Sequence, residues 1–550
     1  MLNKYIEKRI TDKITILNIL LDIRSIELDE LSTLTSLQSK SLLSILQELQ
    51  ETFEEELTFN LDTQQVQLIE HHSHQTNYYF HQLYNQSTIL KILRFFLLQG
   101  NQSFNEFTQK EYISIATGYR VRQKCGLLLR SVGLDLVKNQ VVGPEYRIRF
   151  LIALLQFHFG IEIYDLNDGS MDWVTHMIVQ SNSQLSHELL EITPDEYVHF
   201  SILVALTWKR REFPLEFPES KEFEKLKNLF MYPILMEHCQ TYLEPHANMT
   251  FTQEELDYIF LVYCSANSSF SKDKWNQEKK THTIQLILQH TRGKHLLSKF
   301  KNILGNDISN SLSFLTALTF LTRTFLFGLQ NLVPYYNYYE HYGIESDKPL
   351  YHISKAIVQE WMTEQKIEGV IDQHRLYLFS LYLTETIFSS LPAIPIFIIL
   401  NNQADVNLIK SIILRNFTDK VASVTGYNIL ISPPPSEEHL TEPLIIITTK
   451  EYLPYVKKQY PKGKHHFLTI ALDLHVSQQR LIYQTIVDIR KEAFDKRVAM
   501  IAKKAHYFVI SSSYCLHTKR GFLSHLYSYP HISQFWVNLN RKTLLLSSFC

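Results

Sequence analysis

Residues Lys110 to Phe150 read KEYISIATGYRVRQKCGLLLRSVGLDLVKNQVVGPEYRIRF and concentrate basic residues that are scarce in the chain before them. Apolar side chains recur there at spacings of four and three residues, the period of one helix face: Thr117, Val121, Cys125, Leu128 and Val132. The opposite face and its flanks carry the polar side chains Tyr119, Arg122, Gln123, Arg130, Arg120 and Lys124. Arg and Gln hydrogen-bond base edges in a major groove, and Lys and Arg attract phosphates. This pattern predicts a helix that contacts DNA.

The elements on either side of this helix predict a winged helix-turn-helix. Ser103-Phe-Asn-Glu106 has the pattern of a capping box, which opens a short helix. Leu134 to Val142 has strand character and ends at Gly143-Pro144. The order is therefore capped helix, tight connection, second helix and strand. An ordinary amphipathic helix with a solvated basic face is the alternative.

Composition restricts the class of protein. A chain of 550 residues is long enough for three to five domains, and 45% hydrophobic with 20% charged residues is typical of globular proteins. Because the net charge is only -2, a nucleic-acid surface has to be local. Five scattered cysteines without a CxxC pair favour reduced thiols. A polar N-terminus and the short longest apolar run, Leu391 to Leu400, predict neither signal peptide nor membrane span, so we expect a cytoplasmic protein.

The first 70 residues predict another winged helix. Helices are expected at 10–23, 28–34 and 36–53, followed by a hairpin over 57–69 around an Asp-Thr turn. The third helix places Leu42, Leu43, Leu46 and Leu49 on one side. Lys40 is nearly its only base, and acidic residues crowd its end: Glu48, Glu51, Glu54, Glu55 and Glu56. A packing or dimer-positioning role is therefore at least as well supported as base readout.

A linker with three histidines, His71, His72 and His74, follows this domain. No carboxylate or cysteine nearby completes a ligand set, so we expect no metal and no cofactor. Tyr78 to Leu98 then predicts a long helical region that leads into the capping box.

Beyond Arg147 the chain predicts two helical blocks. In the first, helices are expected at 150–159, 171–190, from Thr193 to Arg211, at 219–243 and at 252–266. His199 lies beside the apolar face formed by Tyr197, Phe200, Val204 and Thr207, which predicts that it meets solvent or a partner. The second block covers 280–391 and contains His341, His352 and His374.

The chain after Leu391 predicts a small parallel α/β sheet. Strands are expected at 394–400, 428–432, 444–449 and 466–472, and helices at 406–417 and 476–504. The residues from 505 to 550 give no assignment.

This order of parts resembles the Mga and RofA-like virulence regulators of Gram-positive cocci. The most telling residues are Gly143-Pro-Glu-Tyr-Arg-Ile-Arg149 and the sequence DYIFLVYCSANSS from Asp257. The resemblance implies a mostly α, multidomain protein. Its expected parts are winged helices at 1–70 and 75–150, phosphotransferase-system regulation domains (PRDs) at 151–278 and 279–390, an EIIB-like α/β domain at 391–505 and a tail at 506–550.

The resemblance also implies phosphorylation of histidines by the phosphocarrier of the sugar phosphotransferase system. It places a first site at His199 and a second at His374, with His352 and His341 as weaker candidates. A second histidine that such domains often carry is absent from Leu261-Val-Tyr-Cys264. The phosphate-accepting cysteine of one EIIB class is absent from Leu400-Asn-Asn-Gln403, which favours an oligomerisation or docking role there.

We therefore expect a regulator that binds promoter double-stranded DNA as a homodimer or higher oligomer and activates virulence or surface-protein genes in response to sugar status. The expected DNA-binding residues are Tyr119, Arg120, Arg122, Gln123, Lys124 and Arg130, with Lys40 in the first winged helix. No phosphate loop, nucleophile elbow or HExxH motif predicts an enzyme. A PRD-type RNA-binding antiterminator and a non-DNA-binding adaptor of the phosphotransferase system are the alternatives.

Overall fold

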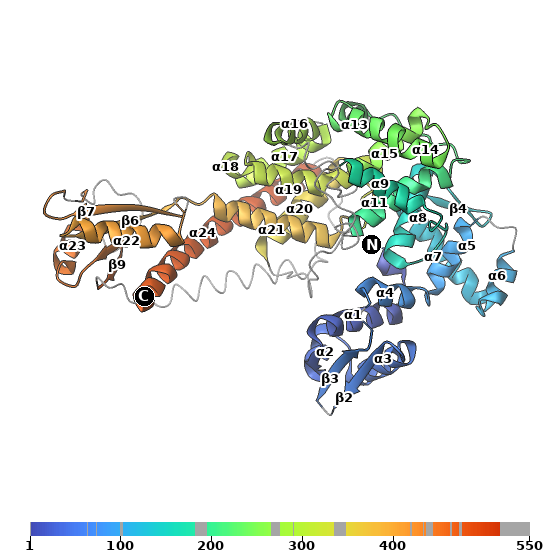
Figure 1. Cartoon of the computed structure of the whole chain (residues 1–550), viewed down its shortest axis with the longest axis horizontal. Helices are drawn as coiled ribbons and strands as arrows, with labels where there is room; N and C mark the ends of the chain where they lie inside the picture. The colour runs from blue at the N-terminus through green and yellow to red at the C-terminus, as the bar shows by residue number, and fades with distance from the viewer. Residues whose placement is uncertain are drawn as a thin grey trace. The chain divides into compact units, whose positions relative to one another are not determined.

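The computed structural model describes residues 2–62, 64–72, 74–98, 103–181, 195–265, 276–289, 291–334, 348–418, 421–432, 434–435, 444–461, 465–471 and 476–517. It divides into two compact units. The first contains residues 1–301 and 306–386, and the second contains residues 302–305 and 387–550. Figure 1 shows the helices and strands of both units.

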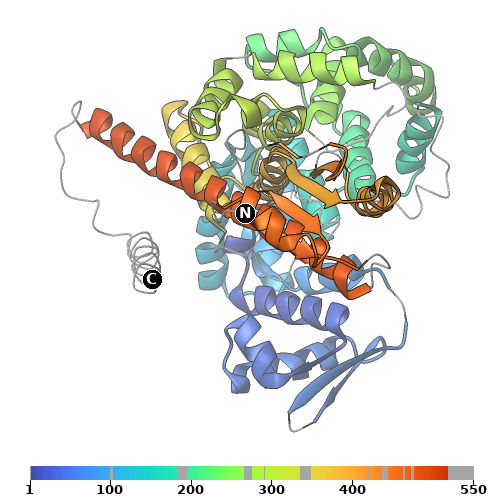
Figure 2. The ribbon, with the colours of Figure 1, turned by 90° about the vertical axis from the view of Figure 1, so that its left-hand side faces the viewer.

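The first winged helix is built as predicted, with one additional strand. After the short 3₁₀ helix η1 (Leu2–Tyr5), its elements are α1 (Lys8–Ile23), β1 (Ser25–Glu27), α2 (Leu28–Thr35), α3 (Ser39–Thr52), β2 (Leu57–Leu61) and β3 (Gln65–Glu70). The sheet is antiparallel in the order β1-β3-β2, and the β2–β3 hairpin projects beside the helices (Figure 2). The prediction for Leu43 is wrong: it is 44% exposed, and Ile45 takes its place beside Leu42 in the core.

A break divides the long helical region that was expected at 78–98. It consists of α4 (Thr76–Tyr84) and α5 (Thr88–Leu97), because the Ser87 side chain caps the backbone of Leu90 and starts a new helix. Tyr79 and Leu83 pack into the core of the first winged helix. Tyr84 packs into the next core, so α4 joins the two domains.

The second winged helix follows with α6 (Phe104–Lys110), α7 (Ile115–Ser131), β4 (Asp135–Val137) and β5 (Gln140–Val142). The capping box at Ser103 and Glu106 is confirmed in both of its hydrogen bonds. The apolar face of α7 is also confirmed, since its members are buried except for the half-buried Thr117. The single strand-like stretch expected at 134–142 is instead an antiparallel hairpin, the wing.

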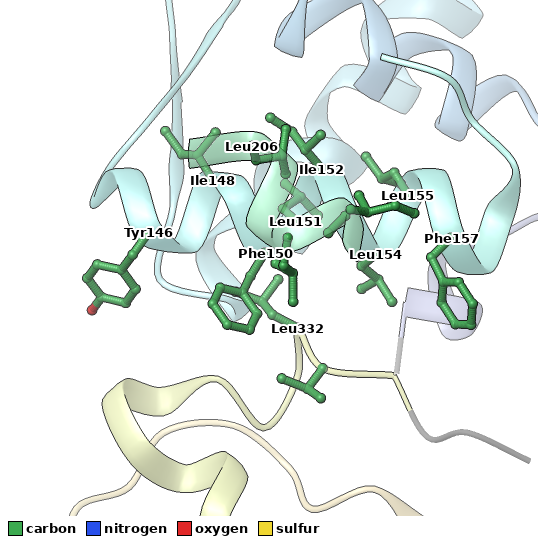
Figure 3. Close-up of a cluster of buried hydrophobic side chains, with 14 of the residues drawn as sticks. Tyr146, Ile148, Phe150, Leu151, Ile152, Leu154, Leu155, Phe157, Leu206 and Leu332 are labelled. Carbon is green, nitrogen blue, oxygen red and sulfur yellow. The ribbon is translucent and has the colours of Figure 1, made fainter. Parts of the chain in front are cut away.

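Helix α8 (Glu145–Phe159) connects this domain to the first helical block, and it is buried nearly all round. The helix was expected to start at Phe150, but it starts at Glu145, more than one turn earlier. The domain boundary expected after residue 150 therefore falls inside this helix. Figure 3 shows Phe150 of α8 facing Leu332, a residue of the second block. One hydrophobic core therefore joins the second winged helix to both helical blocks.

The remaining elements of this unit are helical, as expected for both blocks. The first block continues with α9 (Ser170–Ser181), α11 (Asp195–Lys209), α12 (Lys221–Leu226), α13 (Met231–His238), the π-helix η2 (Cys239–Leu243), α14 (Glu244–Ala247) and α15 (Gln253–Ser265). The second contains α16 (Gln277–Leu288), α17 (Thr291–Leu304), α18 (Asn306–Ser309), α19 (Leu312–Thr322), η4 (Arg323–Gly328), α20 (Pro349–Glu364) and α21 (Gln373–Ser389). Thr193, expected to cap a helix, and His341 lie outside the described residues.

The second unit contains the expected parallel sheet. Its strands are β6 (Ile394–Leu400), β7 (Ala422–Asn428), β8 (Ile445–Thr448) and β9 (His466–Thr469), in the order β7-β6-β8-β9. Its helices are α22 (Gln403–Asn416), α23 (Leu453–Gln459) and α24 (Val476–His517). The strand expected at 428–432 is wrong, because β7 ends at Asn428 and Leu430 and Ile431 are 78% exposed. No described helix is long and apolar enough to cross a membrane.

Candidate nucleic-acid interface

Helix α7 presents most of its predicted polar face to solvent. Arg120, Gln123, Lys124 and Arg130 are exposed, and Arg122 is half-buried. Tyr119 is 46% exposed, and its ring packs edge-on against Phe104 of α6 at 5.6 Å between ring centroids. The apolar side of the helix fixes its orientation, so these side chains form one outward surface.

In the part of the chain that the structure describes, three basic side chains of this surface have no acidic partner that would compensate their positive charge. Within the described residues, Arg120, Arg122 and Lys124 form no ion pair. Arg130 Nη1 lies 3.4 Å from Asp135 Oδ1, but both side chains are more than half exposed. An exposed pair of this kind contributes little to stability, and phosphate can displace its acid. Phosphate contacts need such uncompensated positive charge.

The wing adds a base that the sequence pattern did not reveal. Its two-residue turn is formed by Lys138 and Asn139, whose φ angles are 47° and 64°. The flanking Val137 and Gln140 are paired across the hairpin. Positive φ at both central residues is typical of a type I′ turn, which the asparagine favours. Lys138 is exposed at the tip of the wing.

The first winged helix has a less basic surface. Lys40 is exposed on α3, together with Leu43 and Gln47. The acidic Glu48 is neutralised within the domain, because Arg9 hydrogen-bonds it and Lys13 Nζ lies 3.0 Å from its Oε2. The hydrogen bond from Arg9 holds the pKa of Glu48 below its ordinary value. The acidic end of α3 is therefore less repulsive to DNA than the sequence suggested.

The last turn of α7 is held by Arg147 of α8 and by Asn331 of the second helical block. Arg147 Nη1 donates to the carbonyl of Val132 at 2.8 Å, and its Nη2 donates to the carbonyl of Phe327 at 2.8 Å. Asn331 Nδ2 donates to the carbonyl of Ser131 at 3.3 Å. Helices end with unsatisfied carbonyls, and these donors satisfy two of them. The second helical block thus contacts the end of the predicted reading helix directly.

Buried ion pairs explain two residues of the Gly143–Arg149 stretch. Arg210 donates to both oxygens of Glu145, at 2.7 and 2.9 Å, and Arg149 Nε donates to Glu145 Oε1 at 3.0 Å. All three residues are at most 7% exposed. A bidentate pair has a fixed geometry. The network therefore fixes α8 against the end of α11.

His199 lies in the interior, so the prediction that it faces solvent or a partner is wrong. Its side chain is fully buried on α11, and its ring centroid lies 5.3 Å from that of Phe157 on α8. Burial, the positive charge of Arg375 on α21 and the nearby His158 lower the pKa of His199 to about 3. The imidazole is therefore neutral at physiological pH.

The other described candidate histidines are exposed. His352 lies on α20 and His374 lies at the start of α21. Asp372 Oδ1 accepts hydrogen bonds from the backbone N–H groups of His374 and Arg375, each at 3.0 Å, and so caps this helix. The structure does not bring these two histidines together with His199 as one cluster.

The remaining polar motifs have local structural roles. His71 Nε2 lies 2.7 Å from the Thr58 hydroxyl, and His74 stacks on Tyr78. The described ranges contain no group of three or more His, Cys, Asp or Glu side chains arranged to hold a metal ion. In the loop after β6, the Asn402 side chain accepts from the backbone of Ala404 and caps α22.

The chain contains two winged helices in tandem, and helix α7 of the second one carries exposed bases. Two helical blocks follow them. This combination defines a DNA-binding regulator. Three family models match the chain. The M protein trans-acting positive regulator (MGA) HTH domain covers residues 7–65, the Mga helix-turn-helix domain covers 72–156, and the M protein trans-acting positive regulator (MGA) PRD domain covers 186–385. The chain therefore belongs to the Mga-like family of PRD-containing regulators. No curated protein matches the chain.

Proposed function

We propose that this regulator activates virulence or surface-protein genes, and that histidine phosphorylation by the sugar phosphotransferase system tunes its activity. One observation carries the proposal: the end of α7, the helix with exposed bases, is held by Asn331 of the PRD and by Arg147, which also contacts Phe327 of the PRD. A change in the regulation domain therefore has a direct path to the DNA-contacting helix.

In this proposal α7 lies in the major groove of promoter DNA. Arg120, Arg122, Lys124 and Arg130 supply most of the affinity, Gln123 and Tyr119 contact bases or sugar, and Lys138 of the wing contacts a neighbouring phosphate. Lys40 adds a minor contact from the first winged helix. We place the protein in the cytoplasm as a homodimer or higher oligomer, with the phosphocarrier as a transient partner.

The candidate histidines differ in how accessible they are to phosphorylation. His374 and His352 are exposed and accessible to a phosphocarrier. His199 is buried and requires local opening of the contact between α8, α11 and α21. A phosphate there would add negative charge beside the Arg375 guanidinium, which favours a new ion pair and a rearranged contact between the two helical blocks.

Promoter activity in cells tests the phosphorylation proposal. We expect His199→Asp and His199→Ala to differ in activity by several-fold, because only the aspartate introduces negative charge beside Arg375. The same comparison at the exposed His374 avoids any loss of core packing. Identical activities of the Asp and Ala variants at both positions, across growth on different sugars, would contradict phosphorylation control.

An adaptor that does not bind DNA is the second candidate function. The formal net charge of -2 and the single base Lys40 on the reading face of the first winged helix favour it. Loss of duplex binding in the Arg120→Ala/Arg122→Ala variant would reject it. Stronger binding to hairpin RNA than to duplex DNA would instead favour the antiterminator.

A further inference from the structure

A cavity of about 530 Å³ lies where the end of α7 meets both helical blocks. We call this space the junction cavity. It is lined by the end of α7, the start of α8, the residues around the start of α12, Arg292 of α17, and residues 325–328, 330–331 and 366–368. Its volume lies within the range of about 300–1,000 Å³ that small-molecule sites occupy. Neither the DNA contacts nor the candidate histidines use it.

The floor of the junction cavity carries one positive charge without a carboxylate partner. The half-buried Arg147 makes all of its hydrogen bonds to neutral oxygens: the carbonyls of Val132 and Phe327 and the hydroxyl of Tyr146, at 3.3 Å. Among the described residues, no acid forms an ion pair with it. An anion in the cavity would compensate this charge.

Two buried amide side chains on the same floor have acceptor oxygens without donors. Gln330 is 5% exposed and Asn331 is 8% exposed. Their nitrogens donate to the carbonyls of Glu368, at 2.6 Å, and Ser131, at 3.3 Å. Gln330 Oε1 and Asn331 Oδ1 receive no hydrogen bond from the described protein atoms. Buried acceptors are normally satisfied, so a small shift of these two lining side chains toward the cavity would let the O–H donors of a ligand satisfy both oxygens.

The rim of the cavity is electrically balanced. It carries three bases and three acids: Lys221, Arg292, Lys366, Glu219, Glu222 and Glu368. The rim therefore favours neither sign of charge, and the charge preference of the cavity is set by Arg147 on its floor.

We propose that the junction cavity binds a small polyhydroxylated anion. Its anionic group lies at the Arg147 guanidinium, and its hydroxyls donate to Gln330 Oε1 and Asn331 Oδ1. A sugar acid and a sugar phosphate share this chemistry. No bond is made or broken, so the site is a binding site.

The position of the site lets a bound ligand influence DNA binding through the end of α7. Arg147 and Asn331 each hold a terminal carbonyl of α7, so a ligand that contacts both changes how the helix end is held. This coupling rests on the proposed function of α7 as the DNA reader. Ligand binding itself does not, because it is measured without DNA.

Isothermal titration of the full-length protein tests the proposal with four probes: glucose 6-phosphate, gluconate, glucose and inorganic phosphate. We expect saturable binding of glucose 6-phosphate or gluconate at one site per chain, with glucose and inorganic phosphate at least tenfold weaker. Whichever of the first two binds identifies the anionic group. Binding of neither probe, or equally tight binding of inorganic phosphate, would overturn the proposal.

Three variants locate the bound probe. Gln330→Glu puts a carboxylate on the floor and is expected to weaken binding at least tenfold, and Arg292→Ala removes a rim base and is expected to weaken it several-fold. Lys294→Ala removes an exposed base on the same helix outside the cavity and should leave the affinity unchanged. Wild-type affinity in both cavity variants would overturn the placement. If Gln330→Glu does not fold, the exposed Arg292→Ala decides.

Duplex binding with and without the saturating probe tests the coupling separately. We expect the probe to change the DNA affinity of the wild type at least threefold and to leave that of Gln330→Glu unchanged. An unchanged wild-type affinity would overturn the coupling. A wild type that binds no duplex would contradict the proposed function, while the calorimetry would still decide whether the cavity binds the anion.

Discussion

Arg147 reaches its carbonyl partners because two of its neighbours lack side chains. A Cβ atom at Gly133 would lie 2.0 Å from Arg147 Nη1, and one at Gly328 would lie 2.8 Å from Nη2. Both glycines also have positive φ angles, 72° and 69°, which favour glycine. The contact of α7 with the second helical block therefore depends on these two residues as well as on the arginine.

Substitution of Gly133 tests this arrangement. Gly133→Ala should displace Arg147 and strain the backbone, lowering the free energy of unfolding by about 1–3 kcal/mol, which urea unfolding measures. Gly126→Ala is the matched control within α7, because the nearest atom to its Cβ would be Arg130 Nη1, at an ordinary contact distance of 3.6 Å. The control should be neutral or stabilising by up to about 1 kcal/mol. Equal unfolding midpoints for the two variants would contradict the account of Arg147.

The buried His199 gives a pH prediction. Its pKa is about 3 in the folded protein, below the ordinary value of 6.5, so the unfolded chain takes up the proton first as the pH falls. Above pH 6.5 the histidine is neutral in both states, so its protonation does not affect stability. Between pH 6.5 and 3 the free energy of unfolding decreases by about 1.4 kcal/mol for each pH unit that the pH falls. His199→Gln should weaken this dependence and leave the part that comes from the buried His158, whose pKa burial lowers to about 4.

Urea unfolding at pH 7, 6 and 5 measures the change. The exposed His374→Gln should retain the dependence of the wild type. If His199→Gln and the wild type lose stability in parallel as the pH falls, His199 is not held neutral in the core.

At the scale of elements, α8 depends on a carboxylate shared by two arginines. Glu145 begins the helix, and Arg149 lies one turn later. Arg210, which directly follows α11, pairs with the same carboxylate. Because one carboxylate faces two guanidinium groups, the buried network retains a positive charge, and Arg149 and Arg210 stack near Tyr258 and Phe213.

Removal of that carboxylate should be strongly destabilising. Glu145→Gln leaves two guanidinium groups buried without an anion and should lower the free energy of unfolding by about 3–5 kcal/mol. The control Glu224→Gln neutralises an exposed carboxylate whose partner Lys227 keeps its ion pair with Asp257, and it should cost less than about 1 kcal/mol. A thermal unfolding curve for Glu145→Gln that matches the wild type would show that the network does not hold α8.

Elements with a local signal were predictable from the sequence. The spacing of Val121, Cys125 and Leu128 predicted the core face of α7, and Ser103 with Glu106 predicted the capping box. The Lys138-Asn139 turn also had a local signal, the asparagine, which the strand-like residues around it concealed.

Elements that depend on distant partners were not predictable in this way. The charged residues at the start of α8 suggest a loop between domains when the sequence is read alone. They lie in a helix because Glu145 pairs with Arg210, which is 65 residues away in the sequence. The position of His199 beside the apolar face suggested exposure, but Phe157 and Arg375 from two other helices surround it. The alternation of strands and helices predicted the parallel sheet, whereas β7 was misplaced because its sequence, ASVTGYN, has few apolar residues.

At the scale of the whole molecule, the contacts between the end of α7 and the second helical block join residues that are far apart in sequence. Arg147 and Phe327 are 180 residues apart, and Ser131 and Asn331 are 200 apart. Periodicity carries no information over such distances. The net charge of -2 makes DNA affinity depend on a few local bases, so salt and single substitutions should affect it strongly.

Binding of the purified protein to promoter duplex across a salt series tests the central claim, that α7 reads DNA. We expect steep salt dependence, binding abolished in Arg120→Ala/Arg122→Ala, and a slope of log affinity against log salt reduced by about one in Lys124→Ala. Random duplex and the Lys294→Ala variant, which lacks a base outside this surface, are the controls. Unchanged affinity and slope in the α7 variants, or no duplex binding by the wild type, would contradict the claim.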